Sequence, residues 1–373
     1  MDYATKEGTF SYLKQFKDYS KDFYRFDGEV FVSSLGLGTF RKEPYREENY
    51  IINYKDSLKT AILNGINHID TAINYRYQVS EEEIGEAVSE LIAEGKVSRE
   101  QLFITSKAGF LPLEFPFPEN PYVWIEQNVL NNDLASKEEI IIDQHCMTPD
   151  YLRWSVLKSL QNLNLKTLDV MYLHNPETQL GYVDRRTFKK RIKKAFELFE
   201  KLVEEGKIRY YGIASWNAFL YEEGHTEYIS LKEMVEIALE VGGSQHHFKY
   251  IQSPYNIVKT QAYSYTNQQG PDGKYYTLMQ MVHGYNLKMV ASSSLLQMNL
   301  FKGRFDESIS KALGTSELTD IASALQFARM GNVVSALFGA VDPAHVEDNL
   351  LLAYVPNVSQ ESMDRIYGIK DAI

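Results

Sequence analysis

Short runs of apolar and β-branched residues alternate along the chain with segments whose apolar positions recur every three or four residues. Segments such as 84–91 have the spacing of amphipathic helices, whereas the short runs are typical of buried strands. The eight strand-like runs are residues 31–38, 67–71, 101–107, 169–175, 209–215, 250–256, 288–294 and 334–340. Eight strands joined by crossover helices predict an α/β fold of the (β/α)8 TIM-barrel type, with residues 1–373 as a single barrel domain.

Two segments depart from this alternation. Asp27-Gly28 lies between alternating apolar flanks, which is typical of a two-residue hairpin turn, and we expect an N-terminal hairpin over the bottom of the barrel. The connection from Lys107 to His174 is longer than one strand–helix unit needs, and the excess falls at about residues 110–148. This insertion is rich in proline and aromatic residues, and it either shapes the substrate site or is a packed decoration or subunit contact.

Composition narrows the classes of function. The chain is 44% hydrophobic and 24% charged, which is typical of a globular protein with a core. Its formal charge of -11 disfavours nucleic-acid binding. No apolar run approaches the ~20 residues of a membrane span, and no secretory signal is recognisable at the start. Cys146 is the single cysteine and cannot form an internal disulfide, so we expect a cytoplasmic location. The sequence does not indicate the oligomeric state.

Polar residues stand at the carboxyl ends of three neighbouring predicted strands, where barrel active sites gather. Asp70 is followed by Tyr75, Lys107 ends the third strand, and His174 ends the fourth. A phenol titrates at about 10, and a neighbouring ammonium lowers that pKa. We therefore expect Tyr75 as general acid, Lys107 as the group that tunes it, Asp70 as the partner of Lys107, and His174 as the residue that orients a carbonyl oxygen. These roles fit the reduction of a carbonyl group. Because none of these residues can supply a hydride, a nicotinamide cofactor is needed.

These segments resemble the aldo/keto reductase family. Residues 65–75 resemble its first signature, residues 102–107 its lysine strand, and residues 168–174 its histidine strand. The likeness runs from about residue 30 to about residue 355. It implies a (β/α)8 barrel that uses a nicotinamide cofactor without a Rossmann domain, usually NADP(H), with NAD(H) as the alternative, and a catalytic tetrad of Asp70, Tyr75, Lys107 and His174.

The same resemblance implies cofactor contacts, with several substitutions. Gln252 is similar to the glutamine that holds the carboxamide, while Ser215, with Asn217 as a possible substitute, stands in the usual Ser-Asn segment. Ser292 replaces the aromatic residue that usually stacks under the nicotinamide.

The segment after the eighth strand resembles the site for the adenosine phosphate. Asp348 and Asn349 fit the adenine-contacting pair, Gly339-Ala340 replaces Lys-Ser, and His345 replaces the usual arginine. A 2′-phosphate prefers a bidentate guanidinium, and an imidazole is a weaker, pH-dependent substitute. We therefore predict weaker discrimination between NADPH and NADH than is usual in the family. Asp342-Pro343 is also a good helix start.

Several other patterns are interpreted as structural. The nearly contiguous Asp143, His145 and Cys146 lack the spacing of a metal site, so no metal is expected. His246-His247 lies at the non-catalytic end of the barrel. The basic run 185–194 is interpreted as a solvated helix face rather than an anion-binding patch. Residues 264–270 are interpreted as a polar loop before a turn at Pro271-Asp272-Gly273.

The leading hypothesis is an NAD(P)-dependent oxidoreductase that interconverts an aldehyde or ketone and an alcohol, with a small-molecule carbonyl or sugar as partner. The first alternative is an aldose (sugar) 1-dehydrogenase that forms a lactone with the same residues. The second is a nicotinamide-sensing regulatory protein, for which residues 110–148 offer the candidate docking surface. A purely structural protein would require the four strand-end residues to be accidental.

Overall fold

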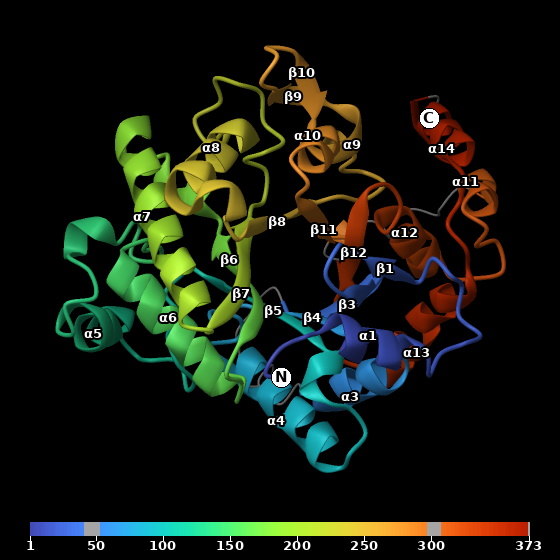
Figure 1. Cartoon of the computed structure of the whole chain (residues 1–373), viewed down its shortest axis with the longest axis horizontal. Helices are drawn as coiled ribbons and strands as arrows, with labels where there is room; N and C mark the ends of the chain where they lie inside the picture. Colours follow the sequence, from blue (N-terminus) through green and yellow to red (C-terminus); the bar gives the residue numbers. More distant parts are fainter. Residues whose placement is uncertain (41–52, 297–306, 372–373) are drawn as a thin grey trace.

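Eight parallel strands close into a barrel in the computed structural model, which describes residues 1–40, 53–296 and 307–371 (Figure 1). The barrel strands are β3 (Leu35–Gly38), β4 (His68–Asp70), β5 (Phe103–Ala108), β6 (Leu168–His174), β7 (Ile208–Ala214), β8 (Phe248–Pro254), β11 (Lys288–Ser292) and β12 (Val333–Phe338). Consecutive barrel strands pair in parallel, and β12 pairs with β3 to close the ring. The predicted (β/α)8 architecture is confirmed.

Helices surround the barrel (Figure 1). They are α1 (Lys6–Leu13), α3 (Lys55–Leu63), α4 (Val79–Ala93), α5 (Pro121–Ile125), α6 (Pro149–Asn162), α7 (Arg185–Glu204), α8 (Leu231–Gly242), α9 (Gln261–Ser264), α10 (Leu278–Gly284), α11 (Glu307–Ala312), α12 (Asp320–Ala328), α13 (Pro343–Leu350) and α14 (Gln360–Asp371). Polar caps fix where several of them begin. Asp184, Ser230 and Thr319 each accept a hydrogen bond from a backbone N–H in the first turn of α7, α8 and α12.

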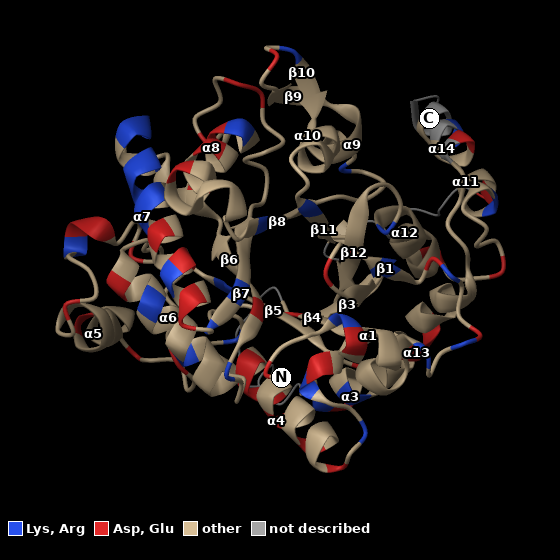
Figure 2. Ribbon diagram, viewed as in Figure 1, with Lys and Arg blue, Asp and Glu red and all other residues tan. Residues whose placement is uncertain are grey.

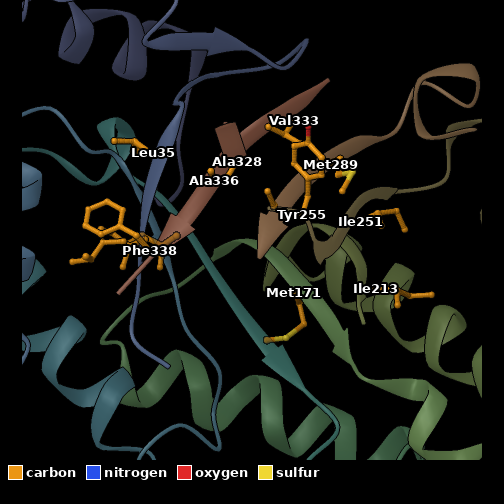
Figure 3. Packing of buried hydrophobic residues seen from close by; sticks show 14 of the residues in the cluster. Leu35, Met171, Ile213, Ile251, Tyr255, Met289, Ala328, Val333, Ala336 and Phe338 are labelled. Atoms are coloured by element: carbon orange, nitrogen blue, oxygen red, sulfur yellow. The ribbon is translucent and has the colours of Figure 1, made fainter. Parts of the chain in front are cut away.

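The strands divide the core into two layers because their side chains alternate between faces. Val170 and Tyr172 of β6 belong to a cluster inside the barrel, whereas Met171 and Leu173 belong to the larger cluster between sheet and helices. Figure 3 shows part of the larger cluster, in which residues from different strands, among them Met171 and Ile213, are labelled.

The N-terminal hairpin is present but differs in detail from the sequence prediction. β1 (Tyr24–Phe26) pairs with β2 (Phe31–Ser33), so the predicted run 31–38 is two strands, of which only β3 enters the barrel. The connecting loop has four residues, 27–30, because the Asp27 carboxylate accepts hydrogen bonds from the N–H groups of Glu29 and Val30. Asp27 also accepts from the Tyr250 hydroxyl, which ties the hairpin to the inside of the barrel.

The insertion at residues 110–148 packs mainly on itself and on α6. Trp124, Val129 and Cys146 share a small apolar cluster with Tyr151 of α6, separate from the barrel core. In Figure 1, α5 lies on the outer side of the molecule, beside α6. The packed-decoration interpretation therefore describes most of this segment.

The segment interpreted as a polar loop is a hairpin. β9 (Thr266–Gln269) pairs antiparallel with β10 (Tyr275–Thr277). The strand is held by its own polar side chains: the Gln268 amide accepts from the Leu231 N–H and donates to the Phe219 carbonyl. Because these buried residues are polar, the apolar alternation that would have predicted a strand is missing.

Candidate active site

The four strand-end residues Asp70, Tyr75, Lys107 and His174, called the tetrad below, meet at the carboxyl end of the barrel. Asp70 ends β4, Lys107 lies in β5, and His174 ends β6. Asp70, Tyr75 and His174 line a cavity of about 870 Å³, and Lys107 is buried behind them. The structure therefore brings together the residues that the strand pattern selected.

Lys107 and Asp70 form a buried ion pair. The Lys107 Nζ donates to Asp70 Oδ1 at 2.5 Å and to the Thr71 carbonyl at 2.7 Å. Asp70 Oδ2 accepts from Thr105 Oγ1 at 2.8 Å and from Gln252 Nε2 at 2.9 Å. Burial lowers the pKa of Lys107, but the charge of Asp70 and the contact with Tyr75 outweigh it, so the pKa lies above its usual value. The ammonium is thus charged and fixed.

Tyr75 lies over this ion pair. The Lys107 Nζ is 4.9 Å from the centre of the Tyr75 ring. Burial raises the pKa of Tyr75, and Lys107 lowers it by less, so the net shift is upward. The sequence predicts the direction of the effect of Lys107 on the Tyr75 pKa, but not the net shift, because desolvation depends on the fold. The phenol is protonated at neutral pH.

His174 faces Tyr75 across the cavity, with the ring centres 5.9 Å apart and the planes nearly perpendicular. Burial, together with the charge of Lys107, holds the pKa of His174 well below its usual value, so the imidazole is neutral. Among the described residues, His174 Nδ1 has no hydrogen-bond partner and is buried. A buried donor without a partner is rarer than a buried acceptor without one, which places the proton on Nε2.

The wall of the cavity combines rings and amides that the sequence argument did not assign. Phe40, Tyr54, Phe110 and Trp216 supply the rings, and Asn74 and Asn175 supply the amides. Asn74 directly precedes Tyr75 and Asn175 directly follows His174. The rule that strand ends carry the site could therefore have predicted both amides. The position of Tyr54, just before α3, carries no such signal.

Cofactor candidates fall into two groups. Ser215, Gln252, Ser292, Gly339 and His345 line the cavity. Asn217 does not line it, and its side-chain oxygen accepts from Lys259 Nζ at 2.9 Å.

Asp348 and Asn349 are also absent from the cavity wall, since they lie farther along α13 than His345. The Ser215 hydroxyl is engaged: it donates to Glu177 at 2.9 Å and accepts from the Ala218 N–H at 3.0 Å.

The cavity fits a dinucleotide. It extends continuously from the tetrad past the end of β11 to the start of α13, where Asp342 caps the helix and Pro343 occupies its first turn, as the sequence predicted. Ser294 lines it, and its buried hydroxyl has no hydrogen-bond partner among the described residues. At this helix start Pro343 has no N–H, and the N–H groups of Ala344 and His345 already bond to Asp342, so the His345 side chain is the candidate contact for a phosphate. Gln252 donates to Asp70 through its nitrogen, which leaves the amide oxygen for a ligand.

The features interpreted as structural have protein partners. His247 bonds to Glu200 at 2.7 Å, and Cys146 Sγ lies 3.4 Å from Thr148 Oγ1. In residues 1–40, 53–296 and 307–371, no three His, Cys, Asp or Glu side chains are grouped as metal ligands. Within these same ranges, no helix has the length and apolar character needed to cross a membrane.

The basic run lies along α7, where Figure 2 shows Lys and Arg concentrated toward one end of the helix. Two of its lysines, Lys189 and Lys193, pair with Glu233 and Glu240 of α8. The solvated-face interpretation therefore holds for most of the run. Arg185 and Arg191 are exceptions, because their guanidinium groups donate to the Tyr228 carbonyl and to the Gln179 side chain.

Comparisons with known proteins identify the family of the chain. The model of the aldo/keto reductase family matches residues 34–371. The chain is 30% identical over 203 residues to glyoxal reductase of Bacillus subtilis, a match that covers 54% of this chain and 52% of that protein. It is 26% identical over 255 residues to aldose reductase B of Dictyostelium discoideum, covering 62% and 65% of the two chains. The chain spans about half the length of the curated relatives it matches.

Solved structures show the same fold. An aldo/keto reductase from Klebsiella pneumoniae in complex with NADP and acetate aligns with a TM-score of 0.61 at 19% identity, covering 94% of this chain and 95% of that one. The aldose reductase from Schistosoma japonicum aligns with a TM-score of 0.58 at 18% identity, covering 94% and 92%. With its barrel, its strand-end residues and a family match over most of its length, the chain belongs to the aldo/keto reductase family.

Proposed function

We propose that this protein is a nicotinamide-dependent oxidoreductase that interconverts an aldehyde or ketone and an alcohol. One observation carries the proposal: Tyr75 lies in a cavity directly over a buried Lys107–Asp70 ion pair and opposite a neutral His174. A protonated phenol beside a fixed ammonium is arranged to give up a proton and to stabilise the phenolate that remains. Membership of the family supports the same reaction.

The roles of the residues follow from their protonation states. The nicotinamide supplies the hydride when bound, and Gln252, Ser292, Ser294, Gly339 and His345 line the space that would hold the cofactor. Tyr75 donates its phenolic proton to the carbonyl oxygen. His174 orients that oxygen through its Nε2–H, and Lys107 stabilises the tyrosinate. The rings of Phe110 and Trp216 reduce the access of water to the reacting groups.

Replacing Tyr75 by phenylalanine tests this assignment. We expect Tyr75→Phe to lower kcat for carbonyl reduction by a factor of roughly 10²–10⁴, because only the transferred proton is removed. Cofactor affinity should stay within about twofold, since the ring remains. Tyr77→Phe is the matched control, because Tyr77 is the nearest tyrosine along the chain and its ring packs on Phe117. Normal turnover by Tyr75→Phe would exclude the mechanism.

We propose NADP(H) as the usual cofactor, with NAD(H) accepted. Tryptophan fluorescence measures both affinities, because Trp216 lines the cavity while Trp124 and Trp154 contact each other at the insertion. We expect the two dissociation constants to differ by less than about a thousandfold, because an imidazole replaces the fork of an arginine at His345. Trp216→Phe should abolish the quenching and serves as the control. NADPH binding a thousandfold tighter than NADH would contradict this assignment.

A sugar substrate is the second candidate, and the two amides beside the tetrad favour it. Asn74 and Asn175 line the cavity and offer donors and acceptors for hydroxyl groups next to the reacting carbon. Assays of aldoses with NAD and NADP distinguish lactone formation from simple carbonyl reduction. Tight cofactor binding with negligible turnover of either class would instead favour the sensing role. The single cysteine, Cys146, supports a proposed location in the reducing cytoplasm.

A further inference from the structure

A histidine of the insertion reaches the backbone of the tetrad. His145 is fully buried, and its Nε2 lies 2.7 Å from the carbonyl oxygen of His174. Its Nδ1 lies 2.8 Å from the side-chain nitrogen of Gln179, in the turn after β6. The side-chain oxygen of Gln179 accepts in turn from the guanidinium of Arg191 on α7. Four residues from three parts of the chain thus form one continuous line of hydrogen bonds.

The donor and the acceptor of every hydrogen bond in this line can be assigned by starting from Arg191. A guanidinium can only donate, so the atom of Gln179 that faces Arg191 must be the oxygen. The amide nitrogen of Gln179 therefore faces His145 and donates to Nδ1. Because Nδ1 is then an acceptor, the proton of the neutral ring lies on Nε2 and is donated to the His174 carbonyl. Burial lowers the pKa of His145 to about 4, which agrees with a neutral ring.

The same histidine also fixes a wall of the cavity. The Phe110 ring lies edge-on to both His145 and His174, with ring centres 5.0 Å apart in each case. Gly109 makes this approach possible: its φ is +146°, and a Cβ there would lie 2.9 Å from both His145 Nε2 and the His174 carbonyl oxygen. Phe110 lines the cavity beside His174.

We propose that His145 is a positioning residue for His174, and that Arg191, Gln179 and His145 form a directional hydrogen-bond chain that holds the His174 backbone and the Phe110 ring at the reacting end of the cavity. The catalytic consequence rests on the proposed function, whereas the hydrogen-bond chain itself does not. The insertion then acts on the site through His145 and Phe110, while its outer part packs on α6.

The first experiment measures the tautomer of His145, which needs no enzymatic activity. Long-range proton–nitrogen NMR spectra of protein labelled with [¹⁵N]histidine distinguish the two neutral forms for each of the eight histidines. The His145 signals are assigned by their loss in His145→Gln. At pH 7 we expect a proton on Nε2 and a bare Nδ1. A proton on Nδ1, or on both nitrogens, would overturn the chain of bonds.

The second experiment separates positioning from simple stability. His145→Leu removes the donor, whereas the amide of His145→Gln can place a nitrogen near the position of Nε2. We expect His145→Leu to lower kcat roughly tenfold to a hundredfold, as for other small misplacements of reacting groups, with KM and cofactor affinity changed by less than about threefold. The His174 ring resonances should shift in His145→Leu, and both properties should largely return in His145→Gln.

Arg191→Met tests the outer end of the chain on a partly exposed helix, where folding is not at risk, and Lys190→Met is its exposed neighbour and control. Arg191→Met should shift the His145 resonances, and Lys190→Met should not. Loss of stability in His145→Leu with unchanged His174 resonances and unchanged kcat would show a purely structural role. If the native protein reduces no carbonyl, the proposed function fails, and the tautomer and resonance shifts still decide the hydrogen-bond chain.

Discussion

At the scale of single residues, Tyr75 is subject to two opposing influences. Desolvation of the phenol raises its pKa, and the ammonium of Lys107, 4.9 Å from the ring centre, lowers it by less. Lys107 itself keeps its charge because Asp70 raises its pKa. The resulting pair is a protonated acid beside a permanent cation. Such a pair is ready for carbonyl reduction at neutral pH, whereas alcohol oxidation needs the phenolate.

The pH dependence of the two directions follows from this state. Since the pKa of Tyr75 lies above its ordinary value near 10, kcat for reduction should be constant through neutral pH and fall only above about pH 10, as the phenol loses its proton. Oxidation of the alcohol should accelerate with pH over the same range. Stopped-flow rates of the hydride step between pH 6 and 11 measure both.

Cofactor binding and circular dichroism at each pH provide the control for this profile. If reduction were lost around pH 8, the Lys107 ammonium would lower the pKa of Tyr75 by more than burial raises it, and the protonation state derived for Tyr75 would be wrong.

At the scale of elements, the turn after Tyr75 is unusual. Arg76, Tyr77 and Gln78 all have positive φ, between 50° and 76°, at a cost of about 1–2 kcal/mol per residue. The turn is held because the Arg76 guanidinium donates to both carboxylate oxygens of Glu83, at 2.6 and 3.1 Å, and Gln78 donates to the Leu113 carbonyl. The insertion therefore contacts the turn that follows Tyr75, at Gln78, and the backbone of His174, at His145.

The insertion should unfold separately from the barrel, because its apolar cluster is separate. Trp124 is 7% exposed and anchors that cluster. We expect Trp124→Ala to make local opening of residues 112–143 easier by about 3–5 kcal/mol, as for other large-to-small core substitutions. Limited proteolysis should then cut within this range at least about tenfold faster while the barrel stays intact.

Tyr122→Ala is the control for this experiment, since Tyr122 lies on the same short helix and is 61% exposed. It should leave the cleavage rate nearly unchanged. Simultaneous loss of the barrel in Trp124→Ala would mean that the insertion and the barrel unfold as one unit.

At the scale of the whole molecule, the parts that the sequence predicts are those governed by period and position. Alternation of strands and helices gives the barrel, and the rule that strand ends carry the site selects Asp70, Lys107 and His174 without contact information. The cavity wall at Tyr54, the β9–β10 hairpin and the line from Arg191 to His174 depend on long-range contacts between polar side chains. No local period encodes such contacts, and the net pKa of Tyr75 depends on burial that only the folded chain provides.

The carboxyl end of the barrel carries the reacting groups, whereas contacts at the opposite end contribute to stability. At the end opposite the cavity, Ala4 is fully buried, its N–H donates to Asp169 Oδ1 at 2.8 Å, and its carbonyl accepts from Arg209 at 2.7 Å. The same Asp169 carboxylate accepts from the Ile104 N–H of β5, so this contact joins the start of the chain to the barrel strands.

A charge at Ala4 should therefore destabilise the whole barrel and leave the chemistry of the folded fraction alone. We expect Ala4→Asp to lower the free energy of unfolding by about 3–5 kcal/mol, because a carboxylate would be buried in the apolar cluster that the Ala4 methyl group shares with Val32 and Phe103. Urea unfolding measures this change, and kcat per folded molecule should stay within about twofold of the native value. Asp2→Ala, which removes an exposed carboxylate 3.3 Å from Lys166, is the control and should alter neither quantity. A large fall of kcat in folded Ala4→Asp would show that the two ends of the barrel are coupled, because a change confined to the closed end has no other route to Tyr75 and His174.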